Sequence, residues 1–116
     1  KNINVDAQIE MGQLRVSLAQ QIQKLAPFGM GNPQPIFLLT GKVTNIRLMG
    51  AEKQHLSFIL ASQNHEVKVV AFGNAKLADN LQKVQNIELV GNIKINKWQD
   101  QETAQIMFLD YREQSN

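Results

Sequence analysis

The sequence predicts a mostly β protein with some α-helix, built as a five-stranded barrel with one helix between its third and fourth strands. Three observations predict this fold. Apolar residues alternate with polar ones in five stretches after residue 35, which is the period of a half-buried strand. One stretch between the third and fourth strands changes to a helical period, and the connections are short enough for hairpins. Strand, strand, strand, helix, strand, strand is the order of an OB fold.

A strand–helix segment is expected before the barrel. Residues 2–9 alternate and predict a half-buried strand. Residues 13–25 follow with a helical spacing that gives one apolar face. Pro27 ends this helix, because the residue before a proline disfavours helical geometry. The apolar face is formed by Leu14, Leu18, Ile22 and Leu25.

The segment Pro27–Pro35, PFGMGNPQP, is predicted to be a shaped linker. It imitates the start of a dinucleotide-binding fingerprint, but it lacks the third glycine and follows a helix rather than a strand, so we reject a cofactor role. Gly29 and Gly31 are expected to supply turn geometry. If either lies at positive φ, replacing it with a β-branched residue should destabilise the chain. The expected organisation is a preceding unit, a linker, an OB domain and a tail: residues 1–26, 27–35, 36–112 and 113–116.

Within the barrel, residues 36–48 are the first strand and HLSFILA is the second. The turn SQNH leads to the third strand, EVKVVAFG. A short helix over 74–84 follows, with Asn74 as its expected N-cap. The turn WQDQE separates the last two strands. The expected inward residues after the third strand are Leu77, Leu81 and Val84 in the helix, Ile87, Leu89, Ile93 and Ile95 in the fourth strand, and Ala104, Ile106 and Phe108 in the fifth.

Composition excludes several functions. The 116 residues are 43% hydrophobic and contain no cysteine, which excludes disulfides and thiolate chemistry and fits a reducing cytoplasm. No apolar run is long enough to cross a membrane, so no membrane partner is expected. His55 and His65 stand ten residues apart without further ligands at metal-binding spacing. The serines lack a nucleophile signature. We therefore expect no catalytic residue, no metal site and no cofactor in this chain.

Charge is unevenly distributed along the chain. Residues 36–98 hold eight basic and four acidic residues, a net charge of +4, whereas the residues from Gln99 onward carry −3. A basic middle suits a polyanion, although a solvated surface gives the same pattern.

The fourth strand carries the most informative row. With Ile93 and Ile95 turned inward, period two places Asn92, Lys94, Asn96 and Trp98 outward in one row. Cations that follow phosphates and a ring that stacks on a base are what single-strand binders combine. The alternative is a tryptophan that caps the end of the barrel.

The second and third strands, which form the usual OB binding face, add outward sets. These are His55, Ser57 and Ile59, and Lys68, Val70 and Phe72. Such a mixture suits base stacking and equally suits packing against a neighbouring domain. The candidate contacts to nucleic acid are Arg47, Lys53, His55, Lys68, Phe72, Lys94, Asn96, Lys97 and Trp98, with the five cations as phosphate contacts.

Four segments give the chain a resemblance to the bacterial RecJ family. They are PFGMGNPQPIF at the junction, HLSFIL, AFG, and NKWQDQETAQIMFLD across the last hairpin. The resemblance covers essentially the whole chain. It implies that residues 1–26 end a DHH-associated domain and that residues 36–112 are the OB domain.

The resemblance also implies a function. RecJ-like enzymes degrade single-stranded DNA from the 5′ end in DNA repair and recombination, with two divalent metals, Mn or Mg, held by DHH motifs. None of those motifs is in this chain, so the metals are implied for a missing catalytic domain. The implied partners are single-stranded DNA, the parent's own catalytic domains and single-strand-binding protein. The alternatives are a protein-interaction module and an enzyme in its own right.

Overall fold

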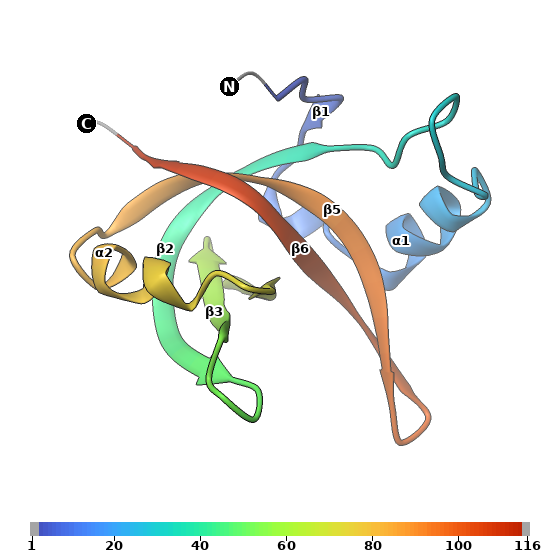
Figure 1. Ribbon diagram of the computed structural model, residues 1–116. Coiled ribbons are helices and arrows are strands. Elements are labelled where there is room, and N and C mark those ends of the chain that lie inside the picture. The colour runs from blue at the N-terminus through green and yellow to red at the C-terminus, as the bar shows by residue number, and fades with distance from the viewer. Residues whose placement is uncertain (1–2, 115–116) are drawn as a thin grey trace.

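The computed structural model describes residues 3–114, which fold into a β-barrel flanked by short helices (Figure 1). The barrel strands are long at the N- and C-terminal ends of the domain and shorter in its middle. In chain order the elements are β1 (Ala7–Gln8), η1 (Met11–Gln13), α1 (Val16–Gln23), β2 (Phe37–Met49), β3 (His55–Ser62), β4 (His65–Ala71), η2 (Ala75–Leu77), α2 (Ala78–Gln82), β5 (Asn86–Trp98) and β6 (Gln101–Glu113).

Pairing between β2 and β5, the first and fourth barrel strands along the chain, closes the sheet. The strands follow the order β1-β2-β3-β4-β6-β5, and β2 also pairs with β5. The β4–β6 pair is parallel, whereas β2–β3, β3–β4, β2–β5 and β5–β6 are antiparallel. The predicted order of five barrel strands with a helix after the third is confirmed, and it is an OB fold.

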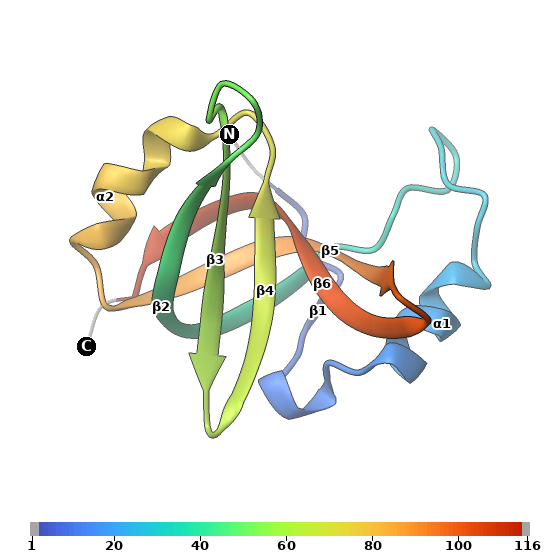
Figure 2. The ribbon, with the colours of Figure 1, turned by 90° about the horizontal axis from the view of Figure 1, so that it is seen from below.

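The core follows the alternation that the sequence predicted. Leu56, Phe58 and Leu60 of β3 are at most 1% exposed, and Ile106 of β6 is fully buried. The inward residues predicted for the 74–84 helix also reach the core, because Leu81 is buried and its two partners pack against the core. Figure 2 shows α2 at one side of the barrel and α1 at the other. Each helix therefore covers a different end of the hydrophobic interior.

Two tight turns set the register of the hairpins. Gln63 and Asn64 have φ of 52° and 67°, and Gln99 and Asp100 have φ of 49° and 65°. Two-residue turns with positive φ at both positions match the right-handed twist of paired strands. The two turns expected from the sequence are thus present, without glycine at these positions.

The N-terminal expectations need correction. The strand predicted over residues 2–9 is reduced to Ala7–Gln8, with residue 2 outside the described residues. β1 runs parallel to the start of β2, along the edge of β2 that β3 occupies from Lys42 onward. Pairing therefore stops after two residues.

The helix predicted over residues 13–25 is also shorter. It runs from Val16 to Gln23, because Leu14 and Arg15 are extended and separate it from the turn η1. Ile22 is buried on its apolar face, whereas Leu25 is 57% exposed beyond the helix end.

The linker is ordered, but not in the way its glycines suggested. Gly29 and Gly31 lack positive φ, and a Cβ added to either would meet nothing within 4 Å. The expectation that they supply left-handed turn geometry is wrong. The loop is instead held by Asn32, whose side-chain amide donates to the carbonyls of Leu25 at 2.7 Å and Pro27 at 3.0 Å.

Asn74 precedes η2 as expected, but its side chain does not cap the helix. The amide nitrogen donates instead to the carbonyl of Phe72 at 3.1 Å. The side chain therefore stabilises the turn after β4 rather than the start of the helix.

A close approach between β5 and β6 makes Gly91 a glycine that the barrel requires. A Cβ at this position would lie 2.4 Å from the carbonyl oxygen of Met107 and 2.7 Å from Ile106. Gly91→Ala is expected to destabilise the domain by about 1–3 kcal/mol, because the two strands must move apart. The measurement is the free energy of unfolding from urea titration. Gly29→Ala is the matched control and should leave it nearly unchanged; equal losses in both variants would contradict the explanation.

Candidate nucleic-acid interface

The cross-strand register places two lysines in one outward row. Lys68 of β4 pairs with Gln105 of β6, and Gln105 pairs with Lys94 of β5. Directly paired residues point to the same face of a sheet. Lys68 and Lys94 are exposed, whereas their inward neighbours Val69 and Ile93 are buried. The row therefore lies on the outside of the barrel and crosses three strands.

Arg47 joins this face beside Lys68. A register shift in β2 between Thr44 and Arg47, with Asn45 at φ 52°, brings Arg47 opposite Ser57 of β3. Arg47 and Lys68 line the same hollow of about 190 Å³. Two cations predicted from separate strands are thus brought together by the bulge.

A second hollow lies on the other side of the row. It measures about 500 Å³, and Phe72 and Lys94 both border it. The Phe72 side chain is 60% exposed. An aromatic ring next to a cation provides a stacking surface and a phosphate contact within one hollow. The full lining is Gln34, Ile36, Phe72, Asn92, Lys94, Met107, Phe108 and Leu109.

Two of the residues predicted to point outward are covered. Ser57 is 4% exposed and Val70 is 7% exposed. They are paired with each other, and Val70 also pairs with Met107, so larger neighbours cover both. Both side chains are thus largely withdrawn from solvent, although Ser57 borders the hollow of Arg47 and Lys68.

Trp98 stands at the end of the row on β5. Asn92, Lys94 and Asn96 alternate with Ile93 and Ile95, and Trp98 continues the outward set. Its indole is 69% exposed. The hairpin of β5 and β6 extends past the body of the barrel (Figure 1). The alternative interpretation, a tryptophan packed over the barrel end, is therefore wrong.

Lys97 lies on the opposite face of this hairpin. It pairs with Glu102 in the ladder, and its Nζ lies 3.4 Å from the Glu102 carboxylate. The Glu102 carboxylate also accepts a hydrogen bond of 3.5 Å from Gln20 in α1. The expectation of one groove lined by all five cations is therefore wrong, because period two separates Lys97 from Lys94.

The remaining two candidates lie in and next to the β2–β3 loop. Lys53 is exposed in that loop with φ 53°. His55 begins β3 and is half-buried; its Nδ1 accepts a hydrogen bond of 2.8 Å from the backbone amide of Gly73. Both lie near the Phe72 end of the face.

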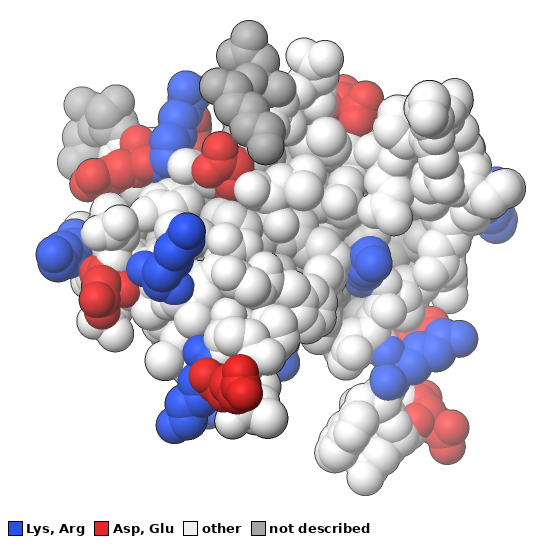
Figure 3. All heavy atoms as spheres, viewed as in Figure 1, with Lys and Arg blue, Asp and Glu red and all other residues white. Residues whose placement is uncertain are grey.

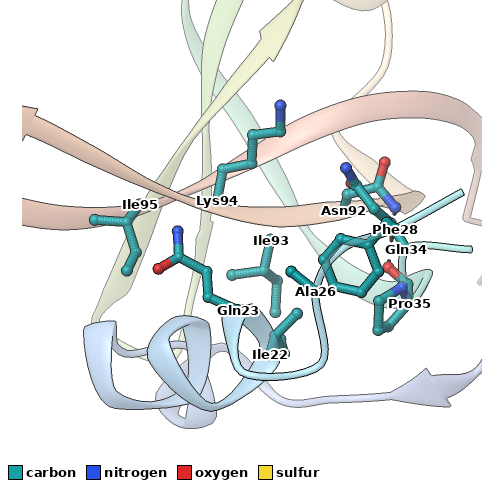
Figure 4. A pocket seen from close by; sticks show the side chains of 10 residues that line it. All are labelled: Ile22, Gln23, Ala26, Phe28, Gln34, Pro35, Asn92, Ile93, Lys94 and Ile95. Carbon is teal, nitrogen blue, oxygen red and sulfur yellow. Dashed lines mark hydrogen bonds between the residues drawn. The ribbon is translucent and has the colours of Figure 1, made fainter. Parts of the chain in front are cut away.

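A cleft between α1, the linker and β5 shows how the extended hairpin is supported. Ile22 of α1 lies close to Ile93 of β5 in this cleft of about 460 Å³, with Phe28 of the linker beside them (Figure 4). The Lys94 side chain runs away from α1 in the same view. Asn92 donates to the Pro35 carbonyl at 2.9 Å. α1 therefore supports the Ile93 face of the hairpin, while the linker also reaches the outward row at Asn92 and leaves Lys94 exposed.

Charge on the face shown in Figure 3 is sparse. Basic and acidic side chains are spread around a broad uncharged centre. Sequence reasoning missed Gln34, Gln105, Met107 and Leu109, which lie on the outer face with the predicted residues. The alternation of β6 could have identified Gln105 and Met107, whereas only the fold brings Gln34 beside them.

Residues 3–114 contain no group of three or more histidine, aspartate or glutamate side chains placed to hold a metal ion. Within the same residues, none of the helices is long and apolar enough to cross a bilayer.

Comparison with known proteins gives consistent matches. The family model described as the RecJ OB domain matches residues 5–110. The single-stranded-DNA-specific exonuclease RecJ of Bacillus subtilis is 28% identical over 107 residues, which cover 91% of this chain and 14% of that protein. The Thermus thermophilus exonuclease of the same name is 31% identical over 93 residues, covering 80% and 13%. The chain thus spans about a seventh of these relatives.

Solved structures agree. RecJ of Thermus thermophilus in complex with Mg²⁺ matches with a TM-score of 0.67 and 28% identity, over 93% of this chain and 16% of that one. The complex with Mn²⁺ gives a TM-score of 0.61 and 29% identity, over 86% and 15%. A small single-stranded-DNA-binding protein from Mycoplasma pneumoniae gives 0.55 at 12% identity, over 70% and 94%, which shows the shared fold alone.

Proposed function

The chain belongs to the RecJ family, as its OB domain, and from this premise we propose that it is the single-stranded-DNA-binding module of a 5′-to-3′ exonuclease. One observation carries the proposal: Lys68, Lys94 and Trp98 share the outer face of the strands that run from β4 to β5. The parent protein would act in cytoplasmic DNA repair and recombination, as the resemblance implies.

The chemistry of the face suits a ligand without defined sequence. Arg47, Lys68 and Lys94 would contact phosphates, and Lys53 in the β2–β3 loop would add a further phosphate contact. Phe72 and Trp98 would stack on bases, with Asn96 between Lys94 and Trp98 in the row. Every base has a flat π-face, so stacking is independent of base identity. An enzyme that degrades any single strand needs this tolerance. Lys97 would take part only through the other face of the hairpin.

A second function is favoured by one observation. Phe72 and Leu109 on the outer face are 60% and 43% exposed, and Met30 on the linker is fully exposed. Apolar groups of this kind also suit a protein partner. In this alternative the surface would dock a partner such as single-strand-binding protein, or the parent's own catalytic domains. If the chain binds oligonucleotides in a salt-sensitive way, the first function is favoured. If it binds a protein partner and does not bind DNA, the second is favoured.

Cleavage would belong to other parts of the parent protein. We expect this chain alone to leave a labelled single strand intact with Mn²⁺ or Mg²⁺ present, because a two-metal phosphodiesterase holds its ions about 4 Å apart with clustered ligands. A gel assay over several hours checks this. Metal-dependent degradation that a substitution within this chain abolishes would contradict it.

The two row lysines are expected to set the salt dependence of binding. Lys68→Ala and Lys94→Ala should each weaken binding to all single-stranded sequences about equally and reduce the log–log salt slope by about 0.7, since each removes one phosphate contact. Fluorescence titration of oligonucleotides at several salt concentrations measures the slope.

Lys83→Ala is the control for these variants, because Lys83 is equally exposed but follows α2 on the other side of the barrel. Its slope should match that of the unmodified chain. A Lys83 variant that flattens the slope as much as the row variants would mean that binding is spread over the whole surface.

Trp98→Ala should weaken binding of single-stranded DNA roughly 5- to 100-fold, which corresponds to about 1–3 kcal/mol for a stacked base. Because the indole is exposed, the free energy of unfolding should change by less than about 0.5 kcal/mol. Trp98→Phe keeps a stacking face and should retain most of the affinity.

The chain contains one tryptophan, so its fluorescence reports on this position alone. Emission that stays constant at saturating single-stranded DNA, or a large loss of stability in Trp98→Ala with unchanged affinity, would exclude stacking at this position.

A further inference from the structure

An exposed ring directly after β4 is held more firmly than its exposure suggests. Phe72 follows Ala71, the last residue of the strand, and 60% of its surface is open to solvent. It borders the larger hollow of the outer face together with Lys94 and Met107. A ring in a turn without partners would sample several rotamers and lose entropy on stacking. Phe72 therefore needs contacts from neighbouring residues to hold its ring in one orientation.

His55 contacts Phe72 in two ways. The His55 and Phe72 rings meet edge to face, with centroids 5.1 Å apart and planes at 82°. The Nδ1 atom of His55 accepts the backbone N–H of Gly73, the next residue, at 2.8 Å. The imidazole therefore bears an unprotonated Nδ1 in this geometry. One contact restrains the phenyl ring and the other restrains its backbone.

The turn geometry makes the backbone contact necessary. Gly73 has φ of 72°, in the left-handed region, and a Cβ at Gly73 would have no neighbour within 4 Å. No neighbouring atom packs over this side of Gly73, and the turn is held by hydrogen bonds, the bond from Gly73 to His55 among them. The others are the Asn74 side chain to the Phe72 carbonyl at 3.1 Å, and Ala75 N–H to the Gln54 carbonyl at 3.2 Å.

The other side of the imidazole packs against the β2–β3 loop. Gly50 in that loop has φ of 97°, and a Cβ there would lie 2.9 Å from Cδ2 of His55. The ring thus lies between the loop that carries Lys53 and the turn that carries Phe72. Of its two ring nitrogens, Nδ1 is already used within the protein.

We propose that His55 is a positioning residue rather than a DNA contact: it holds the Phe72 ring at the edge of the outer hollow so that a nucleobase can stack on it, with the Lys94 ammonium available for the adjoining phosphate. This inference rests on the proposed function. It assigns a stacking site to the hollow and replaces the direct role first expected for His55.

A double-mutant cycle with the 116-residue chain tests this role. Phe72→Ala and His55→Ala are each expected to weaken binding of a mixed-sequence single-stranded oligonucleotide, Phe72→Ala by roughly 5- to 100-fold. The double variant should bind no more weakly than Phe72→Ala, because two residues that act through one contact are not additive. Fully additive losses would show that His55 contacts DNA itself and would overturn the proposal. Fluorescence anisotropy of a labelled oligonucleotide measures binding in all four proteins, independently of whether Trp98 stacks.

A conservative variant separates positioning from general stability. The side-chain oxygen of asparagine can accept from the Gly73 amide where Nδ1 does, so His55→Asn should recover part of the affinity lost in His55→Ala. His55→Leu keeps bulk without an acceptor and should not. If His55→Ala fails to fold, the cycle is run with His55→Leu in its place. Equal affinities for the asparagine and leucine variants would show that the hydrogen bond to Gly73 does not position Phe72, and would overturn that part of the proposal.

A measurement without DNA distinguishes this proposal from the function on which it rests. A through-bond coupling between the Gly73 nitrogen and His55 Nδ1, and slow exchange of the Gly73 amide, are expected in the free protein by NMR. Absence of both overturns the positioning role, even if DNA binds. If both are present but the unmodified chain does not bind single-stranded DNA, the proposed function fails and the stacking site fails with it.

Discussion

The register of β5 against β6 is the constraint on which the rest of the structure depends. These two strands pair from Ile87 with Glu113 to Trp98 with Gln101, with one bulge between Val90 and Gly91, and the alternation of β5 extends from the barrel core to the tip of the hairpin. Inside the barrel it buries Ile93; beyond it the same alternation decides which side chains meet α1 and which face solvent. A slip by one residue would exchange Ile93 with Lys94 and put a charge in the core. The cost of burying an unpaired ammonium therefore fixes the position of Trp98 as well.

The two faces of the hairpin have different roles for this reason. The face with Lys97 and Glu102 meets α1 through Gln20. The face with Lys94 and Trp98 is open. The N-terminal segment thus has a structural role. It lies against one side of the β5–β6 hairpin, which would otherwise extend into solvent without support. A hairpin of two strands alone is marginally stable, so this support keeps the candidate binding row in place.

The outer face depends more on rings and amides than on charge. The cations of the row stand among Gln105, Asn92 and apolar side chains. A face of this kind would bind a single strand with modest salt dependence. The chain spans about a seventh of its relatives, and within a protein of that length it would not need to bind tightly alone. A tethered module raises the local concentration of its ligand near the neighbouring domains. The same apolar groups leave the interaction module as the competing function.

The sequence by itself determined the order of the elements, the inward residues and the row on β5. Period two and helical spacing are local signals, and burial of apolar side chains enforces them wherever the strands pair. The N-terminal strand and helix were overestimated, because pairing partners for β1 depend on where β3 meets β2. The linker glycines do not supply the left-handed turn geometry that the sequence suggests, because Asn32 holds that loop instead.

Only the tertiary structure decided which cations share a face. The β2 bulge brought Arg47 beside Lys68, and the parallel pairing of β4 with β6 aligned Lys68 with Lys94, whereas Lys97 lies on the other side of the alternation. The contacts of His55 with Phe72 and Gly73 join residues far apart in the sequence, 18 positions in the case of Gly73. Composition and spacing do not encode such contacts, because they form only when the β2–β3 loop and the turn after β4 meet at one end of the barrel.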